Sequence, residues 1–350
     1  MKSRQLPAAL VAGLAALSLG LTGCGGSGTS GSASSSAPAD AVTSEAPATT
    51  TTDDTITIGV AVYVDHPSLQ LIRDGFEDYL TSQGVRATYK DANAQADGAN
   101  VATIATTFAQ DPDLDLILAI TTPIAQAIVQ QERDIPVIYA GVTDPADAGL
   151  VTNNEGPSGT NVTGTSDMNP NAKPVELITE IVPDVKTIGV LYSSSEPNSL
   201  VQVTAFENEA APLGITIKPT AVTNTNEIAT AVETMTDVDA ILIPTDNTVV
   251  AGIAPVIAFG EKNQIPVFTA DAESLSKGSI ASRGLSYYEQ GKETGEMAYK
   301  ILVEKVPVGE VPAIISQQTQ LYVNEEAAAA MGVTIPEALL KDATIVTTES

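Results

Sequence analysis

Residues 57–61 read TIGVA, and residues 187–191, 130 positions later, read TIGVL. Each is a short apolar run of the kind that forms a buried strand, and each is followed by a stretch with helical spacing of apolar residues. The same separation relates IPV at 135–137 to IPV at 265–267. A repeated order at a constant spacing indicates duplication, so we expect two similar halves with a crevice between them.

Strand-like and helix-like patterns alternate from residue 56 onward, which predicts parallel sheets covered by helices on both faces. The expected fold class is therefore α/β, with two Rossmann-like lobes. We expect helices from Ser68 to just before Gly84 and at 99–109, 200–211 and 249–262. The expected strands are 56–62, 85–89, 114–120, 135–140, 187–191 and 280–285.

The amino terminus predicts export. An apolar run at 6–21 follows Lys2 and Arg4, and it ends in small residues before Cys24, the single cysteine of the chain. This is the pattern of a signal peptide, and the run is too short and too rich in Ala and Gly for a membrane span. The ending LTGC resembles the lipobox of bacterial lipoproteins, which implies a signal peptide at 1–23 and lipid on Cys24. The alternative is an ordinary signal peptide with an incidental cysteine.

Residues 24–55 are mostly Ser, Thr, Ala, Gly and Pro, a composition that cannot bury enough apolar surface to fold. We expect a disordered linker between the lipid and the folded body.

The charge and the residue inventory exclude several functions. The chain has a formal net charge of −27, with 16 Lys and Arg against 43 Asp and Glu, which argues against binding to nucleic acid. One cysteine and one histidine make a disulfide framework or a zinc site improbable, so no metal and no cofactor is expected. The single histidine, His66, is interpreted as an exposed loop residue.

Polar side chains gather where the expected strands end. Ligands of parallel α/β sheets bind beyond the carboxyl ends of the strands, so these residues are our candidate ligand contacts. Each of them alone could equally be a helix cap or a turn residue. The candidates are Tyr63, Asp65, Thr121, Thr122, Thr143, Asp144, Glu196, Asn198, Ser199, Asp246, Asn247 and Asp271.

The acidic candidates suit a cationic group such as an α-ammonium, and we assign Asp144, Asp246 and Asp271 to it. A carboxylate of the ligand would be held by helix amino termini. We assign the hydroxyls and amides of Thr121, Thr122, Asn198 and Ser199 to that end.

An enzyme on the same fold is the contrasting hypothesis. It would need a positioned nucleophile and base. The chain has no GxSxG stretch and no phosphate-binding glycine loop after a strand, which favours a binding protein.

Several longer motifs resemble the substrate-binding lipoproteins of ABC transporters, in particular the tryptophan/tyrosine (TrpX-like) branch. They are VDHPSL at 64–69, ITTPIAQA at 120–127, GVTDPADAGLV at 141–151, KTIGVLYSSSEPNS at 186–199 and IPVFTADAESLSKG at 265–278. Two positions depart from that pattern: Asp65 stands where many relatives have Glu, and Ser286 where relatives often have Asp.

The resemblance implies a type I periplasmic-binding-protein fold whose lobes are joined by a three-crossing hinge near 161–167, 284–288 and 316–321. It implies a lobe one of 56–163 plus 287–318 and a lobe two of 164–286 plus 319–346. The expected protein is a monomer outside the cytoplasm, anchored to the membrane through Cys24, that closes on a small solute and delivers it to an ABC permease.

The resemblance favours an aromatic amino acid as the solute. A sugar, a nucleoside or another small solute stays open, and so does a role as the sensor module of a membrane receptor.

Overall fold

The computed structural model describes residues 55–132, 134–168 and 173–349. The expected signal peptide, the anchor Cys24 and nearly all of the linker lie outside these residues. Within the described residues, no helix combines the length and the apolar character that crossing a membrane requires.

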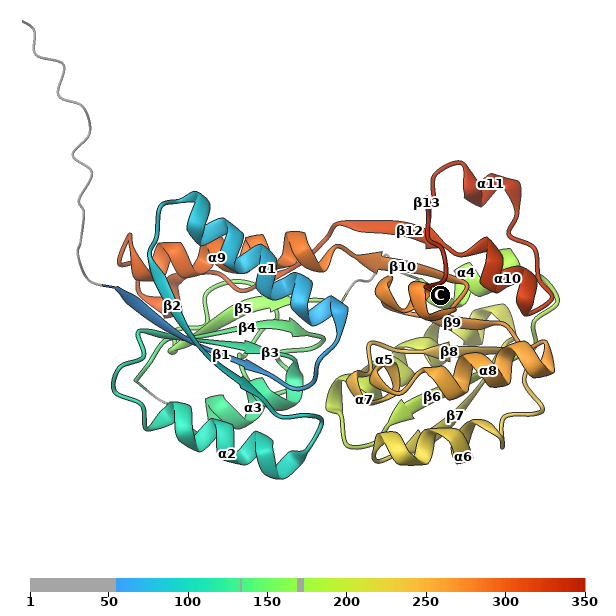
Figure 1. The fold of residues 1–350 in the computed structure, drawn as a ribbon, viewed down its shortest axis with the longest axis horizontal. Coiled ribbons are helices and arrows are strands. Elements are labelled where there is room, and N and C mark those ends of the chain that lie inside the picture. Colours follow the sequence, from blue (N-terminus) through green and yellow to red (C-terminus); the bar gives the residue numbers. More distant parts are fainter. Residues whose placement is uncertain (1–54, 133, 169–172, 350) are drawn as a thin grey trace, which may run out of the picture. The chain divides into compact units, whose positions relative to one another are not determined.

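Five strands from residues 56–166 and one strand from the carboxyl-terminal part of the chain form a six-stranded sheet with the order β11-β5-β4-β3-β1-β2, in which every pair is parallel. We call this sheet and its helices lobe one (Figure 1). Its strands are β1 (Ile56–Val62), β2 (Ala87–Asn93), β3 (Leu116–Ile120), β4 (Val137–Val142), β5 (Val162–Ser166) and β11 (Ile314–Ile315). Its helices are α1 (Pro67–Ser82), α2 (Gly98–Ala109), α3 (Thr122–Gln131), α9 (Tyr287–Leu302) and the 3-10 turn η4 (Val308–Glu310).

Lobe one has an apolar core on each face of its sheet. Leu116, Leu118 and Ile120 of β3 pack into the core beneath α1 and α9. Ile117 and Ala119, which alternate with them, pack into the core beneath α2 and α3. Burial on both faces explains why this strand is a continuous apolar run.

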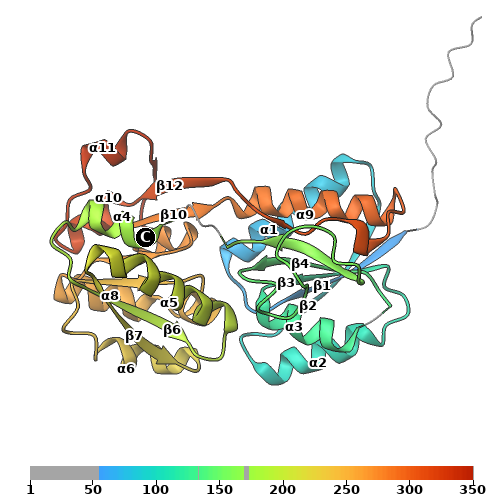
Figure 2. The ribbon, with the colours of Figure 1, turned by 180° about the vertical axis from the view of Figure 1, so that it is seen from behind.

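The second half repeats the arrangement in a four-stranded parallel sheet, β7-β6-β8-β9, which together with a three-stranded sheet, β10-β12-β13, forms lobe two (Figure 2). The strands are β6 (Thr187–Ser193), β7 (Thr216–Val222), β8 (Ala240–Ile243), β9 (Val267–Thr269), β10 (Ala281–Leu285), β12 (Thr319–Val323) and β13 (Thr344–Ile345). The helices are α4 (Pro174–Ile181), α5 (Pro197–Ala210), α6 (Ile228–Val232), α7 (Asn247–Ala251), α8 (Ala254–Asn263), α10 (Glu325–Ala330) and α11 (Glu337–Leu340). Three 3-10 turns complete the lobe: η1 (Ala211–Leu213), η2 (Thr225–Glu227) and η3 (Glu273–Lys277).

The predicted duplication is confirmed. TIGVA lies in β1 and TIGVL lies in β6, and each of these strands pairs in parallel with the next two strands of its half. The carboxyl ends of β1 and β6 therefore occupy equivalent places in the two lobes.

Two predicted elements differ from the structure. The single helix expected at 249–262 is two helices, because Gly252 ends α7 and Pro255, which has no N–H to donate, stands in the first turn of α8. The strand expected at 85–89 runs from Ala87 to Asn93. Its polar second half looks like a loop in the sequence because β2 is an edge strand that pairs only with β1.

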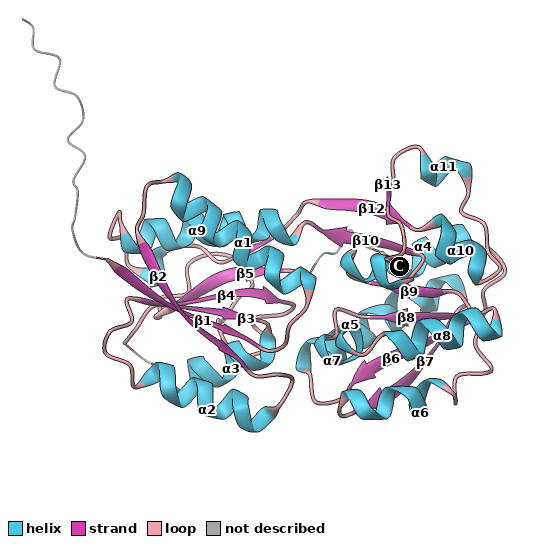
Figure 3. Cartoon of the chain, in the orientation of Figure 1, coloured by secondary structure: helices cyan, strands magenta, loops and turns pink. Residues whose placement is uncertain are grey.

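The chain passes between the lobes three times: after β5, between β10 and α9, and between β11 and β12 (Figure 3). The strand β5 continues to Ser166 before the first passage. We propose the lobe bounds given above with one change: lobe one runs to Ser166, because all of β5 belongs to its sheet.

Candidate functional site

A cavity of about 30 Å³ lies between the two lobes, and we call it the cleft cavity. Lobe one contributes His66, Leu69 and Tyr287, and lobe two contributes Asn198, Asp246 and Asp271. None of the described residues that line it is Lys or Arg. The predicted crevice at the strand ends is therefore acidic.

Two side-chain pairs join the lobes beside this cavity. The hydroxyl of Ser68, in the first turn of α1, donates to the Glu273 carboxylate at 2.8 Å. Thr143, after β4, and Thr245, after β8, have their hydroxyl oxygens 3.5 Å apart. These contacts hold the rims of the two lobes together.

Asp246 is fully buried and rigidly held. Its Oδ1 accepts from the backbone N–H of Val249, capping α7, and its Oδ2 accepts from the Ser199 hydroxyl at 2.6 Å and from the N–H of Ser193. Burial, and next the charge of Glu196, raise the pKa of Asp246 to about 8. A positive group brought into the cavity would lower this pKa and stabilise the carboxylate.

Asp271 follows β9 in the same lobe and lines the same cavity, and only 3% of it is exposed. One of its oxygens accepts from the N–H of Ser274 at 2.8 Å and the other accepts from the Ser274 hydroxyl at 2.9 Å. The carboxylate is thus fixed at the cavity wall by the 3-10 turn η3.

Asp167 also lines the cavity, and the sequence reasoning missed it as a site residue. The Tyr287 hydroxyl donates to its Oδ2 at 3.4 Å, and its buried Oδ1 has no hydrogen-bond partner in the part of the chain that the structure describes. Burial raises the pKa of Asp167 to about 6. Asp167 follows β5 as the other candidates follow their strands, so the position of this strand is the signal that identifies it.

The expectation that His66 is an exposed loop residue is wrong. It is partly buried in the cleft cavity, where its Nδ1 accepts from the N–H of Ser68 and caps α1 at 3.3 Å. Burial lowers the pKa of His66, an effect that the charge of Asp271 opposes. The neutral imidazole therefore adds no positive charge to the site.

Glu196 is not placed for a direct ligand contact. It is fully buried, and its Oε1 accepts from the N–H and the hydroxyl of Thr248 at 2.8 and 2.7 Å. Its Oε2 accepts from the N–H and the side-chain amide of Asn247. Glu196 is absent from the lining of the cleft cavity, and its hydrogen bonds hold the β6–α5 loop against α7.

Asn198 faces the cleft cavity. Its amide N–H donates to the carbonyl of Thr245 at 2.9 Å, while its buried Oδ1 has no partner among the described residues. Asn247 also lines the cavity, and Ser199 lies behind it, where its hydroxyl orients Asp246.

Thr121 and Thr122 form the amino terminus of α3, outside the lining of the cleft cavity. Both hydroxyls are buried without a partner in the described chain. Thr121 has φ of +89°, a conformation that is costly for a β-branched residue and that tends to occur at functional sites.

The remaining candidates lie outside the cleft cavity. Tyr63 belongs to the lobe-one core, and its hydroxyl donates to the carbonyl of Ala96 at 3.4 Å. Asp144 accepts from the N–H of Asp147, as a turn residue does. Thr143 contacts Thr245 as described above. Asp65 lines a different pocket of lobe one.

Comparison with known proteins adds independent information. The family model described as ABC transporter substrate binding protein matches residues 57–347. A tyrosine-binding protein of Clostridioides difficile (strain R20291) is 36% identical over 278 residues, which cover 77% of this chain and 79% of that protein.

Two solved structures resemble the chain over 84% of its length and over their own full length. A domain from Streptococcus pneumonia in complex with L-Trp is 37% identical, with a TM-score of 0.80. A ligand-free, open substrate-binding protein with adhesive properties from Clostridium difficile is 36% identical, with a TM-score of 0.64.

Proposed function

Because this chain belongs to the ABC transporter substrate-binding protein family, we propose that it captures an aromatic amino acid between its lobes and delivers it to a membrane permease. Relatives above one third identity support the ligand class, since one is a tyrosine-binding protein and another is in complex with L-Trp.

The observation that carries the proposal is the acid-lined cleft cavity. Asp167, Asp246 and Asp271 converge on it, and no cationic side chain among its described lining residues balances them. Buried carboxylates without a counter-charge are costly, and an ammonium group of a ligand supplies that charge. We assign the ligand ammonium to these three residues, and Asp144, which lies outside the cavity, is not needed.

The carboxylate end of the ligand requires hydrogen-bond donors. The hydroxyls of Thr121 and Thr122 are the candidates, together with the free backbone N–H groups at the start of α3. The Asn198 amide already donates to the Thr245 carbonyl and to Glu196, so its unpartnered Oδ1, an acceptor, suits the ammonium end instead. Ser199 supports this site indirectly, because its hydroxyl is already donated to Asp246.

Closure of the hinge is the proposed mechanism. A ligand that contacts both lobes favours the closed state by its differential affinity. The Ser68–Glu273 hydrogen bond already joins the lobes, and the chain resembles the L-Trp complex, with a TM-score of 0.80, more than the open ligand-free relative, with 0.64. Both findings support a closed arrangement of this kind.

Substrate-binding proteins of ABC importers work outside the cytoplasm. We propose that this chain is held at the membrane surface as a monomer by lipid on Cys24, and that it catalyses no reaction. Cys24→Ser should move the protein from the membrane fraction to the soluble fraction, and a variant that stays with the membrane would refute this anchor.

A thermal-shift screen of amino acids, sugars and nucleosides against the full chain in mild detergent tests the ligand class. A ligand at about 100 times its Kd should stabilise the fold by about 2.7 kcal/mol. Stabilisation by L-tyrosine, L-tryptophan or L-phenylalanine is the expected result. A set of stabilising compounds without any amino acid would refute it.

A further inference from the structure

We propose that the aromatic side chain of the ligand lies in a second pocket of lobe one, next to the cleft cavity, and that Asp65 recognises its polar edge. We call this the lobe-one pocket. The inference rests on the proposed function, since it assigns a place to one part of the proposed ligand.

The lobe-one pocket has a volume of about 540 Å³, against about 30 Å³ for the cleft cavity. Pockets that bind small molecules usually measure about 300–1,000 Å³, so this one can take a phenol or an indole ring. The cleft cavity alone has room for little beyond the polar head of an amino acid.

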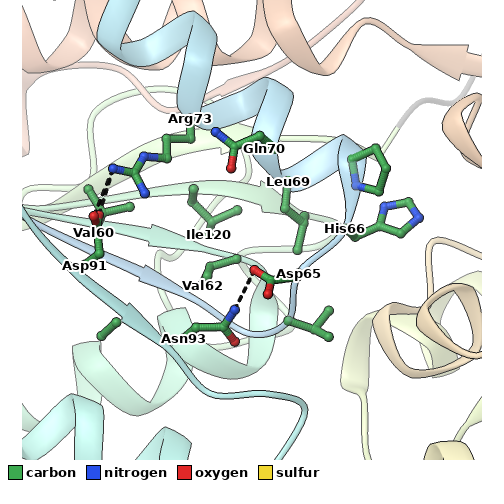
Figure 4. A pocket seen from close by; sticks show the side chains of 13 residues that line it. Val60, Val62, Asp65, His66, Leu69, Gln70, Arg73, Asp91, Asn93 and Ile120 are labelled. Atoms are coloured by element: carbon green, nitrogen blue, oxygen red, sulfur yellow. Dashed lines mark hydrogen bonds and ion pairs between the residues drawn. The ribbon is translucent and has the colours of Figure 1, made fainter.

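The floor of the lobe-one pocket is apolar. Figure 4 shows Val60, Val62, Leu69 and Ile120 together between α1 and the strands. Val60, Leu69 and Ile120 belong to the core under α1 and α9, and Val62 packs against that core while remaining partly exposed. The apolar core thus extends into the pocket at the carboxyl end of β1, and covering such a surface favours binding of an aromatic ring.

The two cavities are adjacent. His66 and Leu69 line both of them, and in Figure 4 His66 stands at the end of the pocket opposite Arg73 and Asp91. A ligand whose charged head lies between Asp167 and Asp271 can therefore extend its side chain past His66 and Leu69 onto the apolar floor.

The polar groups of the pocket select a neutral side chain. Arg73 is already paired, with its Nε 2.6 Å from Glu77 and its guanidinium 2.9 Å from Asp91. These carboxylates balance its charge, so Arg73 does not favour an anionic group on the ligand. The exposed Asp65 accepts from the Asn93 amide at 2.7 Å through one oxygen. Its other oxygen is suited to accept from a phenol hydroxyl or an indole N–H.

Filling the pocket tests the assignment. We would titrate L-tyrosine into the full chain in mild detergent and compare Val62→Phe with Val303→Phe, the same change at an exposed valine at the end of α9. We expect Val62→Phe to weaken binding about tenfold or more, and Val303→Phe to leave it unchanged. Wild-type affinity in Val62→Phe would contradict the assignment of the aromatic side chain to the lobe-one pocket, while leaving the proposed function intact. A wild-type chain that binds no aromatic amino acid would contradict both this assignment and the proposed function.

Asp65→Ala tests whether Asp65 recognises the polar edge of the ligand's ring, with the exposed Asp184→Ala as its matched control. The variant should lose several-fold affinity for L-tyrosine while keeping its affinity for L-phenylalanine, which has no hydroxyl. An equal loss for both ligands, or no loss for either, would overturn the role of Asp65.

Methyl NMR of the wild-type chain locates the ring without any variant. L-Tyrosine should shift the methyl signals of Val62 through the ring current, and L-alanine should not. Leu285 and Phe206 line another cavity, which shares Asp167 and Tyr287 with the cleft cavity. Shifts confined to Leu285 would place the ring there and overturn the inference.

Discussion

Ser68 of lobe one and Glu273 of lobe two are 205 residues apart in the chain, and the hydroxyl of the first donates to the carboxylate of the second at 2.8 Å. Burial, and next the charge of Asp271, raise the pKa of Glu273 to about 7. A contact that joins the lobes therefore depends on an acid that is half protonated near neutral pH.

Stability should fall as pH rises through this region. The folded chain keeps the proton of Glu273 up to about pH 7, whereas the unfolded chain loses it near the ordinary glutamate pKa of 4.5. Between these pH values the folded state binds more protons than the unfolded state. Raising the pH from 4.5 to 7 therefore lowers the free energy of unfolding, by up to about 3 kcal/mol in total. Thermal unfolding of Glu273→Gln at pH 5 and pH 8 should show a smaller pH effect than wild type. The exposed Glu326→Gln should behave as wild type, and an unchanged pH effect in Glu273→Gln would contradict this role.

Ligand binding should release protons. The pKa of Asp167 is raised to about 6 and that of Asp246 to about 8, and an ammonium group beside them lowers both. Affinity for an amino acid should then rise with pH from 5.5 to 8, by up to about tenfold for each unit by which a pKa is lowered. Calorimetry across this range measures the effect. Asp246→Asn should flatten the profile, and an affinity that is the same at both ends would contradict the assignment of the ammonium to these residues.

Glu196→Gln should destabilise the fold. Every partner of Glu196 is a hydrogen-bond donor, so the new NH₂ group would face N–H or hydroxyl groups of Asn247 and Thr248. We expect a loss of about 1–3 kcal/mol in the free energy of unfolding, measured by denaturant titration, with the exposed Glu207→Gln within about 0.5 kcal/mol of wild type. Wild-type stability together with lost ligand affinity would instead mean that Glu196 contacts the ligand.

Gly291→Ala should separate α1 from α9. A Cβ at Gly291 would lie 2.1 Å from the carbonyl oxygen of Ile72, which is backbone and cannot rotate away. The strain should cost about 1–3 kcal/mol of unfolding free energy. Gly98→Ala, where a Cβ meets nothing within 4 Å, is the matched control. Equal stability of the two variants would show that the helices are not packed this closely.

The alternation of strands and helices and the duplication were predictable because buried parallel strands are apolar in the sequence itself. β5 was missed as a strand because its residues VTGTS resemble a loop, although all five are buried. Their hydroxyls are satisfied by distant groups: Thr163 donates to the carbonyl of Val311 at 2.8 Å, and Thr165 lies 3.0 Å from the hydroxyl of Thr294. No local pattern reveals partners 148 and 129 residues away.

Part of the candidate site was predictable because its residues follow strands that are apolar in the sequence. Asp246, Asp271 and Asn198 follow apolar strands and do line the cleft cavity. Glu196 has the same position in the sequence pattern, but it is turned toward donors at Asn247 and Thr248 and does not line the cavity. Residue type and strand end predict that a carboxylate is near the site, and only the tertiary contacts decide whether it faces the cavity.

Calorimetric titration of L-tyrosine into the full chain, its Asp271→Ala variant and its Asp184→Ala variant tests the central claim most directly. If the acidic cleft cavity holds the ammonium of an amino acid, wild type and Asp184→Ala should bind alike, and Asp271→Ala should bind at least about tenfold more weakly. Equal affinity of all three proteins would contradict the account, as would a wild-type chain that gives no binding heat with any aromatic amino acid.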